Sequence, residues 1–140
     1  MTGKPAAGYS GKALADKLGI RTGMRIAAVG APRDYASLIA PLSRAVTITN
    51  RAGARADLVH YFVARRADLE SRIAALDRSL RDDAVLWISW PKQSSGHPTD
   101  LTEDVLRQVI LPLGLVDVKV CAVDDTWSGL KFVRRLKHRR

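Results

Sequence analysis

Short, nearly continuous apolar runs alternate with segments of helical period along this chain, and they constrain its fold more than any other feature. Such runs suit strands that are buried on both faces, as in a parallel sheet with helices on either side. Apolar side chains at helical spacing predict an amphipathic helix over residues 67–80 that covers this sheet. We therefore predict an α/β, Rossmann-like fold with a mostly parallel sheet. The apolar runs span residues 24–30, 45–49, 58–63 and 84–90.

Capping residues mark the other expected helices. Ser10 is a candidate cap for a short helix that stops at Gly19. Asp34 is a candidate cap for a helix that follows the first strand. Asp100 and Glu103 lie in a stretch that resembles a capping box, which predicts that Asp100 caps the helix after the fourth strand. We also expect an i, i+4 pair between Glu103 and Arg107 on that helix.

The C-terminal part of the chain has a different pattern. Residues 116–122 and 127–133 each alternate between apolar and other side chains, and the short acidic turn Asp124-Asp125 lies between them. Two alternating runs joined by a short turn predict an antiparallel hairpin at the edge of the sheet. Because an exposed edge strand presents unpaired backbone groups, pairing with a second copy into a homodimer is an open alternative.

Length and composition predict one α/β domain over residues 1–140, with a leader at residues 1–7 and a basic tail at residues 134–140. The single cysteine, Cys121, has no partner for an internal disulfide, which favours a reducing cytoplasm. No stretch reaches the roughly 18 apolar residues that a membrane span needs. We expect a cytoplasmic bacterial protein that does not bind a membrane.

The net charge of +9 is concentrated near the C-terminus. Without the five basic residues of the tail the net charge falls to +4, so the body is not strongly basic. Association with nucleic acid is therefore expected only through the tail, and only without sequence specificity. The basic tail residues are Arg134, Arg135, Lys137, Arg139 and Arg140.

Two segments resemble class I S-adenosylmethionine-dependent methyltransferases. They are ADLV at residues 56–59 and LRDDAVLWIS at residues 80–89. The resemblance implies a glycine-rich turn after the first strand and an acidic residue that ends the second strand and binds the cofactor's ribose. Here the turn reads VGAPR and the second strand ends TNR, with one glycine and no carboxylate. We therefore expect a truncated methyltransferase-like fold that lacks the cofactor motif and holds no cofactor.

A second resemblance covers residues 8–134. The chain is similar to a small bacterial family catalogued as a domain of unknown function, which implies no activity. The segments that carry the resemblance are GYSG at 8–11, LGI at 18–20, WPK at 90–92, SSG at 94–96, PTDLTE at 98–103, PLGLVDVKVCAVD at 112–124 and TWSGLKF at 126–132.

Ligands of open α/β sheets bind beyond the carboxyl ends of the strands, so the loops at residues 30–34 and 91–99 are the candidate site. Cations and hydroxyls there suit an anionic ligand, and the tryptophans suit stacking. Asp100 weakens an anion site if it caps the next helix, and the serines and Thr99 have turn building as an alternative role. The candidate ligand-binding residues are Arg33, Trp90, Lys92, Ser94, Ser95, His97, Thr99 and Trp127.

We assign no catalytic residue and no metal ligand from the sequence. His97 has no identifiable acidic partner and no second histidine or cysteine at metal-ligand spacing, and His60 lies in a buried run where a hydrogen-bonded core histidine is expected. We expect a non-catalytic domain that binds a partner protein or a small anionic ligand at the strand-end edge. The alternatives are a minimal methyltransferase, or another transferase, and nucleic-acid association through the tail.

Overall fold

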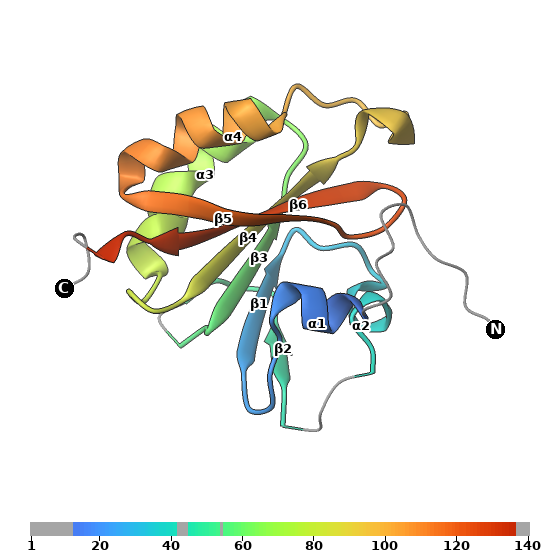
Figure 1. Cartoon of the computed structure of the whole chain (residues 1–140), viewed down its shortest axis with the longest axis vertical. Coiled ribbons are helices and arrows are strands. Elements are labelled where there is room, and N and C mark those ends of the chain that lie inside the picture. The colour runs from blue at the N-terminus through green and yellow to red at the C-terminus, as the bar shows by residue number, and fades with distance from the viewer. Residues whose placement is uncertain (1–12, 42–44, 54, 137–140) are drawn as a thin grey trace.

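A computed structural model describes residues 13–41, 45–53 and 55–136 (Figure 1). They form a six-stranded sheet in the order β2-β1-β3-β4-β6-β5. The first four strands in this order are parallel, and β6 and β5 add an antiparallel hairpin. This confirms the predicted Rossmann-like α/β fold. The strands are β1 (Arg25–Val29), β2 (Thr47–Thr49), β3 (Leu58–Phe62), β4 (Val85–Pro91), β5 (Leu115–Ala122) and β6 (Trp127–Arg134).

Helices cover both faces of the sheet, as predicted. Helices α1 (Leu14–Leu18) and α2 (Tyr35–Leu38) lie on one face, and α3 (Arg66–Ser79) and α4 (Glu103–Ile110) lie on the other (Figure 1). Single turns of 3₁₀-helix follow β4 (Gln93–Ser95) and α4 (Leu111–Leu113). The predicted cap at Ser10 lies outside the described residues.

Strand β3 shows why its sequence is continuously apolar. All five of its residues are buried, and successive side chains enter the two cores in turn. Val59 and Tyr61 pack with α3 and α4, whereas Leu58 and Phe62 pack with α1 and α2. Because a strand with a core on each side has no face in contact with solvent, its sequence does not alternate between apolar and polar residues.

Asp100, which we expected to cap α4, instead binds the N-terminus of α3. Thr102 caps α4, because its hydroxyl oxygen accepts the N–H of Val105 at 3.2 Å. The carboxylate of Asp100 instead accepts the N–H of Arg66, the first residue of α3, at 2.7 Å. Its negative charge therefore lies at the positive end of α3, which stabilises that helix. The prediction that Asp100 caps α4 is wrong.

Arg134 also differs from its expected place. It is the last residue of β6 and is 8 % exposed, and its guanidinium lies 2.7 Å from the Asp77 carboxylate of α3. Arg134 is thus part of the packed fold and not of a solvated tail.

Strand β5 forms an edge of the sheet, where Val118 and Val120 are each about half exposed. Pairing of this edge with a second copy stays a prediction. No helix within the described ranges is both long and apolar enough to cross a membrane.

Candidate functional site

Two pockets lie side by side at the carboxyl ends of the parallel strands. The first, which we call the glycine-turn pocket, has a volume of about 600 Å³ and is formed by the turn from β1 into α2 and by the end of β2. The second, the hairpin pocket, has a volume of about 540 Å³ and is formed by the loops after β3 and β4 and by the β5–β6 turn. Pro32 lines both pockets. Both volumes suit a small-molecule ligand.

The glycine-turn pocket is built on Gly30. This residue has a φ of 67°, in the left-handed region that favours glycine. A Cβ atom at Gly30 would lie 2.8 Å from the carbonyl oxygen of Phe62, at the end of β3. The end of β1 and the end of β3 can approach this closely only because Gly30 has no side chain, and Gly30 itself lines the pocket.

Asn50 follows the last residue of β2 and lines the glycine-turn pocket. Its side-chain amide has an acceptor oxygen and two N–H donors, so it can bond to ligand hydroxyls. Arg51 does not line this pocket and lies instead along two pockets on the side of β1 and β2 where α3 packs. The cation that the sequence places near the end of β2 is therefore not in the ligand position.

A buried polar chain lies beneath the glycine-turn pocket. Tyr35 lines the pocket, and its hydroxyl is hydrogen-bonded to Nδ1 of His60 at 3.0 Å. Nε2 of His60 is hydrogen-bonded to the hydroxyl of Ser89 at 2.6 Å. Burial lowers the pKa of His60 to about 3 and raises the pKa of Tyr35, so both stay neutral near pH 7. The prediction of a hydrogen-bonded core histidine is confirmed.

Aromatic side chains connect this chain to the hairpin pocket. The His60 ring stacks on Phe62 with a centroid distance of 4.2 Å, and Phe62 meets Trp127 edge-on at 5.0 Å. Trp127 lines the hairpin pocket. One packed series of rings from Tyr35 to Trp127 therefore forms a rigid base under both pockets.

The structure divides the residues that the sequence proposed for the site. Arg33 lines the glycine-turn pocket, whereas His97 and Trp127 line the hairpin pocket. Trp90 is 6 % exposed and packs in the core with α3 and α4. The remaining proposed residues, which line neither pocket, are Lys92, Ser94, Ser95 and Thr99.

Hydrogen bonds explain two of these residues as turn builders. The Ser95 hydroxyl donates to the carbonyl of Lys92 at 2.6 Å and accepts the N–H of His97 at 3.2 Å. The Thr99 hydroxyl donates to the carbonyl of Ala64 at 2.6 Å and accepts the N–H of Leu101. These contacts hold the loop after β4 in the shape that places His97 at the hairpin pocket. A ligand-binding role for the residues of this loop stays a prediction.

Sequence reasoning missed Asn50 and Tyr35 as pocket residues. Asn50 carried a signal in the sequence, since it directly follows a strand, but an amide there is not the carboxylate that the methyltransferase resemblance implies. Tyr35 matched an apolar helix face and carried no signal of its hydrogen bond to His60. Within the described residues, no group of three or more histidine, cysteine or acidic side chains lies where it could hold a metal ion.

Solved structures that are similar to this chain include methyltransferases and a protein of the NADB-Rossmann superfamily. No protein-family model matches the chain, and no curated protein matches it. The chain is similar to a SAM-dependent methyltransferase from Aquifex aeolicus, with a TM-score of 0.63, 12 % identity, and coverage of 85 % of this chain and 86 % of that one.

Two further structures support this likeness. Magnesium protoporphyrin IX methyltransferase from Synechocystis, with bound SAM, has a TM-score of 0.54 at 12 % identity and covers 86 % of this chain and 74 % of its own. A protein of the NADB-Rossmann superfamily from Streptococcus agalactiae has a TM-score of 0.54 at 10 % identity. The likeness covers 90 % of this chain and 69 % of that protein. The methyltransferase-like fold is therefore confirmed over most of the chain.

These likenesses correct the expectation of a non-catalytic binding domain. Several solved structures that share this fold along most of the chain are methyltransferases, and this likeness of fold agrees better with the alternative of a minimal methyltransferase. One physical reason for that expectation is also removed, because Arg51 lines two other pockets and not the glycine-turn pocket. The glycine-turn pocket offers groups that suit S-adenosylmethionine: one glycine at the start of the turn, the Asn50 amide for the ribose hydroxyls, and the Arg33 guanidinium for the carboxylate.

Proposed function

We propose that this protein is a minimal S-adenosylmethionine-dependent methyltransferase. The observation that carries the proposal is the pair of pockets that share Pro32, one built on Gly30 and Asn50 for a cofactor and one of similar volume for a methyl acceptor. Group transfer needs two ligands held side by side, which adjoining pockets provide.

Three residues would hold the cofactor. Gly30 lets it approach the backbone, the Asn50 amide bonds to the ribose hydroxyls, and Arg33 pairs with the carboxylate. S-Adenosylmethionine supplies an electrophilic methyl group on a sulfonium. Because a neutral amide replaces the usual carboxylate, the bond to the ribose lacks charge assistance and is about half as strong. We therefore expect weaker cofactor binding than a carboxylate would give.

The hairpin pocket would hold the acceptor. Trp127 and Pro91 offer apolar walls for a planar group, and the His97 imidazole at the same pocket can take the proton that an acceptor nitrogen or oxygen loses. Thr99 and Ser95 act as positioning residues, since their hydrogen bonds shape the loop that carries His97. The small bacterial family that the chain resembles would share this arrangement. A cytoplasmic location for this protein is proposed because its single cysteine, Cys121, cannot form an internal disulfide.

The proposal is tested by blocking the glycine-turn pocket from α2. Ala36 is exposed on α2 and lines the pocket, whereas Ser37 is its exposed neighbour and does not. Ala36→Trp should weaken S-adenosylmethionine binding at least about tenfold by filling the pocket, a loss of about 1.4 kcal/mol in binding free energy. Isothermal titration calorimetry measures both variants.

The matched control, Ser37→Trp, places the same indole on the same helix and should keep the affinity of the unmodified protein. Equal affinity in the two variants would place the cofactor elsewhere. An unmodified protein that binds no S-adenosylmethionine would refute the proposed function.

A further inference from the structure

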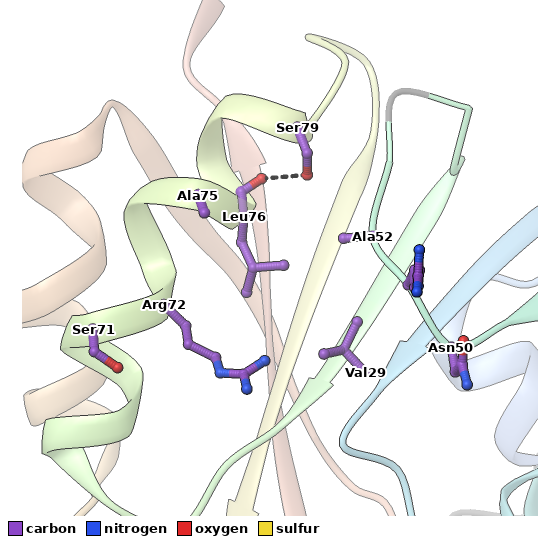
Figure 2. A pocket seen from close by; sticks show the side chains of 9 residues that line it. Val29, Asn50, Ala52, Ser71, Arg72, Ala75, Leu76 and Ser79 are labelled. Atoms are coloured by element: carbon purple, nitrogen blue, oxygen red, sulfur yellow. Dashed lines mark hydrogen bonds between the residues drawn. The ribbon is translucent and has the colours of Figure 1, made fainter.

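Two other pockets form a continuous groove on the side of β1 and β2 where α3 packs. One, of about 420 Å³, lies between α3 and the segment after β2 (Figure 2), and the other, of about 570 Å³, lies against β1, β2 and residues 53–56. Asn50 and Arg51 line both pockets. We call this surface the arginine groove, after its four arginines, Arg25, Arg51, Arg55 and Arg72.

The groove exists because the chain crosses from β2 to β3 without a helix. Residues 50–53 and 55–57 run between the two strands as turns and irregular structure. On this face of the sheet, helices α3 and α4 cover β3, β4 and β6, which follow β1 in the strand order (Figure 1). The outer part of the sheet on this face is therefore open to a ligand.

The charge of the groove is of one sign. Among the described residues that line its two pockets, four are arginines and none is acidic. All four arginines are exposed and no ion pair of the described chain includes them, although the Asp57 carboxylate accepts the backbone N–H of Arg25 and attracts its side chain. The arginines that are paired with carboxylates lie elsewhere, namely Arg66, Arg81, Arg107 and Arg134. Concave surfaces of one charge concentrate ligands of the opposite charge.

The smaller pocket adds an apolar floor to this charge. Figure 2 shows Leu76 of α3 and Val29 of β1 facing each other, with Arg72 extending from α3 toward the space between them. Asn50 stands at the far rim of the pocket. A flat apolar group can therefore lie on Val29 and Leu76 beside a guanidinium plane, while anionic groups follow the other arginines.

We propose that the arginine groove binds single-stranded nucleic acid. Phosphates along the groove would pair with the guanidinium groups, and one unstacked base would occupy the pocket beside Arg72. Proteins that bind single strands combine these features: a cationic path for the backbone and a surface for unstacked bases. A duplex keeps its bases stacked and could not place one in this pocket. The inference does not rest on methyl transfer, although Asn50 would put the strand next to the glycine-turn pocket.

The test is fluorescence anisotropy with a labelled oligouridylate of about 12 nucleotides. The double variant Arg51→Gln/Arg72→Gln should bind about tenfold more weakly than the unmodified protein. Its dependence of log K on log salt should be shallower by about 0.7, because Arg51 is the one phosphate contact that is lost, whereas Arg72 lies beside the base. Circular dichroism and thermal unfolding confirm that these exposed substitutions leave the fold intact.

The control double variant, Lys119→Gln/Arg135→Gln, removes the same charge from exposed positions at the opposite, β5 edge of the sheet and should bind as tightly as the unmodified protein. Deletion of residues 136–140 should also leave binding in place. Equal weakening in both double variants, loss of binding on deletion of the tail, or no binding at about 50 mM salt would overturn the proposal. Ala36→Trp should leave oligouridylate affinity unchanged, which separates this result from the outcome for the cofactor.

Discussion

Replacement of Gly30 by alanine is expected to lower the free energy of unfolding by about 2 to 4 kcal/mol and to abolish binding of S-adenosylmethionine. The backbone at Gly30 has a φ of 67°, which costs an alanine about 1 to 2 kcal/mol. Its new methyl group would also lie 2.8 Å from the Phe62 carbonyl oxygen, which is fixed in the sheet. The turn must move away from β3, and the glycine-turn pocket changes shape. Chemical denaturation and calorimetric titration measure the two effects.

Gly23 offers a matched control for the energetic cost of placing an alanine at a positive φ. It has a φ of 85°, and an added Cβ would meet nothing within 4 Å. Gly23→Ala should therefore cost only about 1 kcal/mol and leave cofactor binding unchanged. If the two alanine variants lose equal stability, the close approach of Gly30 to β3 does not constrain the turn.

Stability should fall as the pH is lowered from about pH 7 to about pH 5, by about 2 kcal/mol. The cause is His60, whose pKa is lowered by burial to about 3 in the folded protein but is about 6.5 when unfolded. Below about pH 6.5 His60 is protonated in the unfolded chain but stays neutral in the folded protein. The free energy of unfolding therefore falls as the pH is lowered, until the pH reaches the pKa of folded His60. The groups that touch His60, namely Tyr35, Ser89 and Phe62, do not titrate in this range.

The variant His60→Gln isolates this effect. Glutamine keeps a side chain with both a donor and an acceptor but cannot titrate, so the stability of this variant should change far less between the two pH values. Denaturant unfolding at each pH gives the comparison. An unchanged pH dependence in His60→Gln would mean that other groups control the acid sensitivity.

Burial on both faces made the strands predictable. The nearly continuous apolar run of β3 predicted a strand that is buried on both faces, and the alternation in β5 and β6 predicted the hairpin. The predicted face of α3 is also present, with Leu69, Ile73 and Leu76 buried. These elements could be predicted because the order of apolar and polar residues along each segment reflects which of its side chains are buried.

The site was less predictable because its contacts join distant segments. Asp100 had the local signature of a cap, but its carboxylate bonds to Arg66, which lies 34 residues earlier. The role of Gly30 depends on Phe62, and the role of Tyr35 depends on His60. Spacing along the chain contains no information on such pairs, so the sequence did not predict the roles of Tyr35 and Asn50 at the turn after β1.

Charge counting had a similar limit. The five basic residues at the C-terminus looked like one tail, yet Arg134 is buried against Asp77. Four arginines spread between positions 25 and 72 gather instead along one groove. Net charge predicts that a polyanion can bind but not where, because ion pairing is decided in the folded chain.

The most direct test of the proposed function is an amide NMR titration of the unmodified protein with S-adenosylmethionine. The cofactor should shift the amide signals of Gly30, Ala31 and Asn50 in a saturable way, because these residues line one pocket at the ends of β1 and β2. Signals of Val118 and Val120 on the distant β5 edge should not move. A spectrum that is unchanged at millimolar cofactor, or shifts confined to residues outside the glycine-turn pocket, would contradict the assignment of this protein as a methyltransferase.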